Sequence, residues 1–118
     1  MTTREPIPHL LVDAYDCSDT LDDAGRIRDA MHAAAEKVGA TIVDQAECRY
    51  VPHGLTAVLF LAESHILVST WPEHRTALID VLLCNAQMDA EAVADTILDA
   101  LGASRSEIRQ VGRQLVDG

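Results

Sequence analysis

The residue types that could do chemistry are concentrated between positions 50 and 85. A carboxylate, a hydroxyl and an imidazole follow one another at Glu63-Ser64-His65, and a thiol follows at Cys84. A thiol suits proton transfer because its pKa can be tuned towards neutrality, and a carboxylate such as Glu73 offers two acceptor oxygens. The segment contains further candidates: Tyr50, His53, Thr56, Ser69, Trp71 and His74. A lone Glu-Ser-His triplet has no diagnostic value, so order and spacing must carry the assignment.

Strands and two helices are predicted around these residues. Apolar runs and alternation predict strands over residues 9–15, 41–50, 55–62, 65–71, 77–84 and 107–116. A helix is predicted over residues 21–38, because Ile27, Met31 and Ala35 recur every four positions, with capping side chains before it at 17–20. A second helix is predicted over residues 90–101, capped by Asp89 and ended by Gly102.

This order of elements predicts an α+β fold, with a mostly antiparallel sheet and two helices packed on one face. The strand at 55–62 contains the run Val58-Leu59-Phe60-Leu61 and is expected to be buried on both faces. A second copy is therefore expected to cover the face without helices. The predicted assembly is a homodimer, or a higher homo-oligomer, that dimerises through its sheets.

Length and charge narrow the class of protein. The 118 residues fit one domain, 1–118. A formal net charge of -10 argues against a nucleic-acid partner, which would need clusters of Lys and Arg. No run approaches the roughly 18 apolar residues of a membrane span, so no membrane partner and a cytoplasmic location are expected. The spacing of Cys17, Cys48 and Cys84 suggests neither a disulfide framework nor a zinc site, and no metal is expected.

Taken together, the motifs resemble those of the bacterial pyruvoyl-dependent S-adenosylmethionine decarboxylase proenzymes. Glu63-Ser64-His65 is followed after three residues by Ser69-Thr-Trp-Pro-Glu73, and then by Asp80 and Cys84. Two further stretches match, His-Leu-Leu-Val-Asp at 9–13 and Gly-Ala-Thr-Ile-Val at 39–43. The resemblance implies the S-adenosylmethionine decarboxylase-like fold. It also implies self-cleavage between Glu63 and Ser64, which gives chains of residues 1–63 and 64–118.

The chemistry implied by the resemblance begins with the Ser64 hydroxyl, which attacks the preceding carbonyl. β-Elimination then cuts the chain, and Ser64 becomes a pyruvoyl group at the new N-terminus. This cofactor forms a Schiff base with the amine of S-adenosylmethionine and accepts electrons while carbon dioxide leaves. The product is the aminopropyl donor of polyamine and spermidine biosynthesis.

Other positions take roles from the same resemblance. Cys84 matches the cysteine that returns a proton to the decarboxylated carbon. Glu73 matches the glutamate that holds the ribose hydroxyls, and Tyr50 matches the aromatic residue that stacks on adenine. Thr56 matches the hydroxyl residue that assists ester formation during processing. Trp71 is expected to pack at the end of its strand.

Ser69 departs from the family pattern, which usually has a histidine here that removes the serine α-proton. A hydroxyl is a far poorer base at neutral pH, and loss of a general base typically costs about 10²–10⁴ in rate. Three outcomes are open. His65, His53 or His74 substitutes as the catalytic base, or processing is slow yet sufficient, or the chain stays uncleaved.

Three functions therefore remain open from the sequence. The first is decarboxylation of S-adenosylmethionine after cleavage. The second is an uncleaved family member that binds a nucleoside ligand or a partner. The third is a pyruvoyl decarboxylase of another amino acid, against which Tyr50 and Glu73 argue because they suit a nucleoside. A smaller departure is Asn85, which follows Cys84 where the family commonly has glycine.

Overall fold

The computed structural model describes residues 2–3 and 5–117. Its helices are α1 (Ala24–Lys37), the short 3₁₀ helix η1 (Pro72–His74) and α2 (Ala90–Leu101). Its strands are β1 (Thr2–Thr3), β2 (Ile7–Tyr15), β3 (Ile42–Arg49), β4 (Leu55–Leu61), β5 (Ser64–Trp71), β6 (Thr76–Leu82), β7 (Arg105–Arg113) and β8 (Val116–Asp117).

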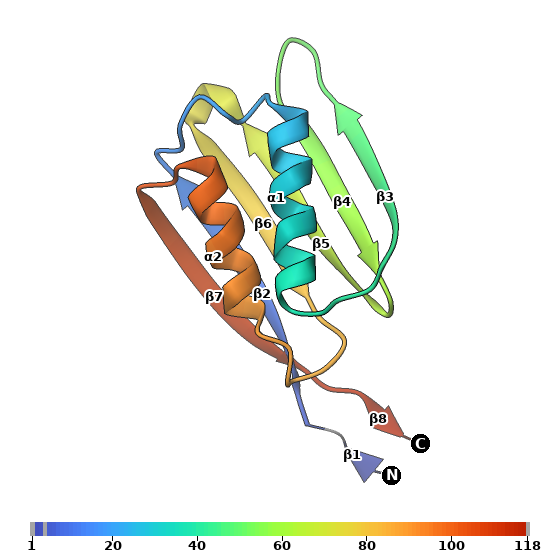
Figure 1. The fold of residues 1–118 in the computed structure, drawn as a ribbon. Coiled ribbons are helices and arrows are strands. Elements are labelled where there is room, and N and C mark those ends of the chain that lie inside the picture. The colour runs from blue at the N-terminus through green and yellow to red at the C-terminus, as the bar shows by residue number, and fades with distance from the viewer. Residues whose placement is uncertain (1, 4, 118) are drawn as a thin grey trace.

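Six strands form one sheet in the order β3-β4-β5-β6-β2-β7, and every neighbouring pair is antiparallel. Both helices cover the same face of this sheet, with α1 over β4 and α2 over β2 and β6 (Figure 1). β1 and β8 form a separate two-stranded pair near the chain ends. The predicted α+β architecture is confirmed.

The core lies between the helices and the sheet, because alternate side chains of the central strands point to that face. In β4, for example, Leu55, Ala57, Leu59 and Leu61 are buried, whereas the residues between them are not. Each helix contributes an apolar stripe at helical spacing. The stripe of α1 is Ala24, Ile27, Ala30, Met31, Ala34 and Ala35. The stripe of α2 is Ala90, Val93, Ala94, Ile97 and Leu101.

The ends of the helices agree in part with the predictions. Asp89 caps α2 by accepting a hydrogen bond from the Ala92 N–H, as predicted. Gly102 ends α2 with a φ of 62°, and an added Cβ would lie 2.8 Å from the Ser18 Oγ. The prediction that residues 17–20 cap α1 is wrong. Asp23 caps it instead, and accepts from the Arg26 N–H at 3.0 Å.

Some strands begin or end at other residues than predicted, because an apolar run in the sequence does not always end where backbone pairing ends. β6 ends at Leu82, so Cys84 lies in the loop before α2. The prediction that Cys84 belongs to a strand is wrong. The last long strand, β7, begins at Arg105 and is exposed along its whole length. Ser64 is the first residue of β5, one position earlier than expected.

The face of the sheet without helices, here called the open face, carries both apolar and polar side chains. Phe60 is 44% exposed and Leu78 is 40% exposed on this face, so β4 is not buried on both sides within one chain. That expectation is wrong for the single chain. In the described part of the protein, no helix is long and apolar enough to cross a bilayer.

Candidate active site

The Glu63-Ser64 bond lies in the tight turn between β4 and β5. Ala62 and Glu63 connect the two strands, and both are exposed. Glu63 has a φ of 64°, in the left-handed region that costs a residue with a Cβ about 1–2 kcal/mol. The Ser64 hydroxyl donates to the Ala62 carbonyl at 3.4 Å, so it points back along the chain, towards the residues that precede it. The turn thus presents a strained, solvent-accessible peptide bond next to a hydroxyl.

Cys84 lies at the same end of the sheet as this turn. Glu63 and Cys84 line one cavity of about 690 Å³, together with the end of β6 and the segment after β7. The other lining residues are Ile7, Leu82, Leu83, Arg113, Gln114, Leu115 and Val116. Cys84 is partly buried, whereas Cys17 is buried, and this burial raises the pKa of the Cys17 thiol. The turn and Cys84 are called the Ser64 end below.

A second group of predicted residues lies around a cavity of about 400 Å³ lined by Tyr50, Thr56, Ser69, Trp71 and Glu73, among others. The Tyr50 hydroxyl donates to Thr56 Oγ1 at 2.9 Å, and Thr56 Oγ1 lies 2.9 Å from Ser69 Oγ. Because Thr56 accepts from Tyr50, its own proton is free to bond to Ser69. Trp71 is the last residue of β5, is 41% exposed and lines the same cavity.

Glu73 completes this second group from η1, and its Oε2 bonds to His53 Nε2. His53 comes from the loop between β3 and β4, and η1 connects β5 to β6, so the pair links two connecting segments at this end of the sheet. This group is called the Ser69 end below. Figure 1 shows the β3–β4 loop and η1 at the opposite end of the sheet from the β4–β5 turn.

The two ends are too far apart to act together within one chain. Ser64 and Ser69 belong to the same strand, and five residues of strand span about 16 Å. The idea that His53 or His74 lies beside the cleavage bond because it is near in sequence is wrong for the single chain, because both lie at the Ser69 end. Of the three histidines considered as replacements, His65 alone lies next to Ser64.

His65 belongs to a polar cluster on the open face that the sequence did not reveal. Asp80 Oδ1 lies 3.0 Å from His65 Nε2 and 2.6 Å from His9 Nε2. The three side chains come from β5, β6 and β2, and both histidines pair with the same residue, Leu82. Only that register, which joins segments far apart in the chain, could have indicated the cluster.

These three groups are also ligand types for a metal ion, with their ligand atoms within 4.8 Å of one another. Arg113 Nη1 lies 3.1 Å from His9 Nδ1, and arginine can only donate, so Nδ1 must accept. The proton of His9 is then on Nε2 and bonds to Asp80. Metal-bound histidines usually donate through their second nitrogen. The arrangement fits a hydrogen-bonded network better than a metal centre.

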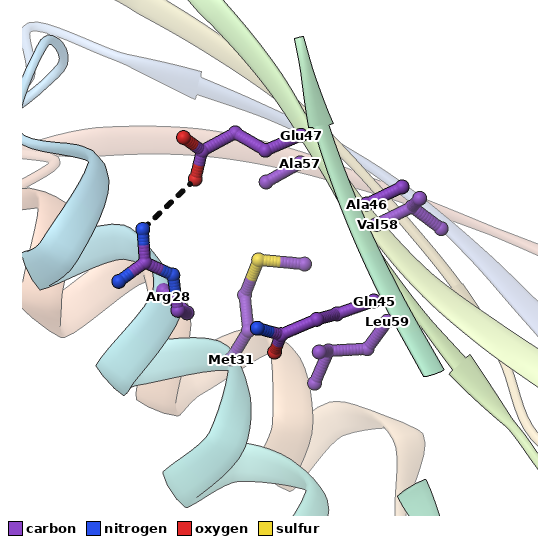
Figure 2. A pocket seen from close by; sticks show the side chains of 8 residues that line it. All are labelled: Arg28, Met31, Gln45, Ala46, Glu47, Ala57, Val58 and Leu59. Carbon is purple, nitrogen blue, oxygen red and sulfur yellow. Dashed lines mark hydrogen bonds and ion pairs between the residues drawn. The ribbon is translucent and has the colours of Figure 1, made fainter. Parts of the chain in front are cut away.

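A third cavity, of about 230 Å³, lies between α1 and the strands β3 and β4. Figure 2 shows Arg28 and Glu47 paired across it, with Met31 at its side. Gln45 on the same wall bonds to His32. This cavity is on the helix side of the sheet and contains none of the predicted site residues.

The sequence matches the family model described as S-adenosylmethionine decarboxylase over residues 8–114. The chain belongs to the S-adenosylmethionine decarboxylase family. It is 35% identical over 107 residues to the S-adenosylmethionine decarboxylase proenzyme of Pseudomonas paraeruginosa (strain DSM 24068 / PA7). The aligned region covers 90% of this chain and 67% of the relative. It is 33% identical over 107 residues to the proenzyme of Prochlorococcus marinus (strain MIT 9313), and the aligned region covers 90% of this chain and 86% of the relative.

A solved structure agrees with this membership. The crystal structure of the adenosylmethionine decarboxylase from Aquifex aeolicus VF5 matches with a TM-score of 0.87 and 30% sequence identity, over 97% of this chain and 95% of that chain. The resemblance and the fold class are therefore confirmed. S-adenosylmethionine decarboxylases are carboxy-lyases, so the chain is a member of an enzyme family.

Within this S-adenosylmethionine decarboxylase fold, the site residues are divided between two ends of one sheet. The Ser64 end holds the Glu63-Ser64 turn and the thiol of Cys84. The Ser69 end holds the aromatic, hydroxyl and carboxylate groups that suit a nucleoside, among them Tyr50 and Glu73. The first end can supply bond cleavage and proton transfer, and the second can supply recognition.

Proposed function

We propose that the chain is a pyruvoyl-dependent decarboxylase of S-adenosylmethionine that first cleaves itself between Glu63 and Ser64. The product is the aminopropyl donor used to make spermidine and other polyamines. The observation that carries the proposal is the turn itself, in which a left-handed Glu63 precedes Ser64 and lines the same cavity as Cys84. A strained peptide bond, a nucleophilic hydroxyl and a thiol acid are the groups that this chemistry requires.

Self-cleavage needs the Ser64 hydroxyl, a base that accepts the Ser64 α-proton, for which the neighbouring His65 is the candidate, and water. The Ser64 oxygen attacks the Glu63 carbonyl carbon, the C–N bond breaks, and an ester and a free amine replace the amide. Removal of the Ser64 α-proton then expels the Glu63 carboxylate and leaves dehydroalanine at residue 64. Hydrolysis of dehydroalanine releases ammonia and leaves the pyruvoyl group. Relief of the left-handed conformation at Glu63 favours the reaction, because the cut chain no longer has to turn there.

The Ser64 end fits the group that results. The new N-terminus would lie at the start of β5, beside the cavity that Cys84 lines. When formed, the pyruvoyl carbonyl supplies an electron sink for the carbon dioxide that leaves. Cys84 then holds the proton for the decarboxylated carbon, because its side chain is partly buried and reaches the same cavity.

The Ser69 end is assigned to substrate recognition and to assistance in processing. Tyr50 is half exposed, which leaves a ring surface for adenine. Glu73 uses Oε2 for His53, and the carboxylate has a second oxygen for a ribose hydroxyl. Thr56, placed between Tyr50 and Ser69, is the hydroxyl that assists ester formation.

A homodimer would bring the two ends together. The open face exposes large apolar side chains, among them Phe60, Leu78 and Val111, over several neighbouring strands. Such a surface is typical of an interface between copies. If two copies pack with their open faces together and their β5 strands in opposite directions, the Ser69 end of one copy lies over the Ser64 end of the other.

The function is tested by two measurements on purified protein. Intact-mass analysis should find the two fragments, residues 1–63 and a pyruvoyl-capped 64–118. Incubation with S-adenosylmethionine labelled at the carboxyl carbon should release labelled carbon dioxide, whereas labelled ornithine and arginine should not. A single full-length mass that persists on long incubation, without carbon dioxide release, would exclude the proposal.

Whether the site is shared between copies is tested by complementation. Ser64→Ala disables the Ser64 end and Glu73→Ala disables the Ser69 end, so each variant alone should be inactive or severely impaired. Co-expressed with different tags and purified as a heterodimer, the pair should regain carbon dioxide release, because one of the two sites then has both ends intact.

The matched control is co-expression of Ser64→Ala with Cys84→Ala. Both substitutions affect the Ser64 end, so no heterodimer site is complete and activity should stay lost. If Ser64→Ala and Glu73→Ala also fail to complement, although the heterodimer forms, each site is contained in one chain and the shared arrangement is wrong.

Ser69 favours a second candidate function, that of an uncleaved member that keeps a nucleoside pocket. The hydroxyls of Tyr50, Thr56 and Ser69 form a continuous chain, so Ser69 is held in hydrogen bonds and does not supply a base. Binding of S-adenosylmethionine by full-length, uncleaved protein, measured by calorimetry, would favour this function if no fragment ever forms.

A further inference from the structure

The side chain of Asn85 lies against the thiol that the proposed reaction uses. Asn85 Nδ2 is 3.6 Å from Cys84 Sγ, within range of a hydrogen bond to sulfur. On another side, Cys84 Sγ is 3.8 Å from Met88 Sδ, which can accept from the thiol. All three residues belong to the loop between β6 and α2. The thiol therefore has a donor and a weak acceptor from its own loop.

The orientation of the Asn85 amide follows from its other bonds. Asn85 Oδ1 accepts from the Gln87 N–H at 3.0 Å and from the Met88 N–H at 3.1 Å. Backbone N–H groups only donate, so the atom that faces them must be the oxygen. The NH₂ group is then the end that faces Cys84. The turn from Asn85 to Met88 thus holds an N–H donor towards the sulfur.

We propose that Asn85 is a positioning residue that stabilises the thiolate of Cys84 through this N–H donor. The inference rests on the proposed function, in which Cys84 gives up its proton to the decarboxylated carbon. A donor bonds more strongly to a charged acceptor than to a neutral one, so the bond strengthens as the proton leaves. Glycine, the common family residue at this position, has no side chain that could provide this donor.

Other charged groups near Cys84 belong to different elements. Glu63 from the β4–β5 turn and Arg113 from the end of β7 line the larger cavity that Cys84 lines. Glu5 from the N-terminal segment lines a second cavity with Cys84 and Asn85. These groups stay the same when position 85 is changed, so a difference between variants reports the side chain at 85.

The test measures thiolate formation at Cys84 directly, as the pH at which alkylation by iodoacetamide reaches half its maximal rate. Peptide mass spectrometry separates Cys84 from the other cysteines. Asn85→Asp keeps the shape and the turn acceptor but places an oxygen, and a negative charge, against the sulfur. Asn85→Ser keeps a short acceptor for the turn and removes the amide N–H donor.

We expect the midpoint for Cys84 to rise by about one pH unit or more in Asn85→Asp, because a like charge disfavours the thiolate. A smaller rise is expected in Asn85→Ser. The exposed Cys48 on β3 serves as an internal control, and its midpoint should not move. Equal midpoints for Cys84 in wild type and in Asn85→Ser, with unchanged melting temperature, would overturn the inference.

This readout does not require cleavage or activity. A shifted midpoint in a chain that never releases carbon dioxide would keep the role of Asn85 and exclude the decarboxylase function. Active protein with an unshifted midpoint would keep the decarboxylase function and exclude the role of Asn85. If Asn85→Ser does not fold, Asn85→Gly carries the test, because it removes the amide donor without adding a charge.

Discussion

Ser64→Ala should leave the chain permanently at its full length and abolish release of carbon dioxide from S-adenosylmethionine. Without the hydroxyl there is no nucleophile to attack the Glu63 carbonyl, and no pyruvoyl group can form from residue 64. The effect should therefore be complete on the timescale of an assay. It is measured by intact mass and by trapping labelled carbon dioxide after long incubation.

The fold should tolerate this change. The Ser64 side chain makes one long hydrogen bond, to the Ala62 carbonyl at 3.4 Å, and is partly exposed. The matched control is Ser106→Ala, on the exposed strand β7, which should cleave and decarboxylate like wild type. If Ser64→Ala still yields fragments that meet at residue 64, another nucleophile opens the turn and the proposed mechanism is wrong.

Ser69→His should accelerate self-cleavage by about 10²–10⁴, the usual contribution of a general base. Position 69 pairs directly with Thr56 across β4 and β5, so an imidazole there would stand beside the hydroxyl assigned to processing. In the proposed dimer it would also lie over the Ser64 end of the other copy. Freshly translated chains, quenched at successive times and separated on a denaturing gel, give the rate of cleavage.

Ser69→Ala is the control, because it removes the hydroxyl without adding a base. It should cleave no faster than wild type. If Ser69→His and Ser69→Ala cleave at the same rate, position 69 does not govern proton removal, and His65 with its partner Asp80 becomes the base to examine. Wild-type protein that is already fully cleaved as it is made would also contradict the expected acceleration.

Local patterns in the sequence predicted the elements well, but not all of their ends. The spacing of Ile27, Met31 and Ala35 describes one face of a helix, which no distant residue has to confirm. The cap of α1 was mistaken because capping residue types occur repeatedly from Ser18 to Asp23, and propensity alone cannot choose among them. Cys84 was placed in a strand because apolar sequence continues through Leu83, although pairing ends at Leu82.

The candidate site was predictable as a set of residues but not as an arrangement. The motif identified Ser64, Ser69 and Glu73 together, yet the strand that carries the two serines keeps them at opposite ends of the sheet. His9 and Asp80 were part of the family resemblance without any assigned role. Their contact with His65 depends on the register of β2, β6 and β5, and register is a property of the folded sheet.

The strand order has a consequence for the two fragments that the proposed cleavage would produce. β3, β4 and β2 belong to residues 1–63, and β5, β6 and β7 belong to residues 64–118. In the sheet they alternate, so that β2 of the first fragment is inserted between β6 and β7 of the second. The fragments are thus interleaved by hydrogen bonds at three junctions, and a cut in the turn separates nothing. Cleaved protein should keep its native size and appear as two pieces only after it is unfolded.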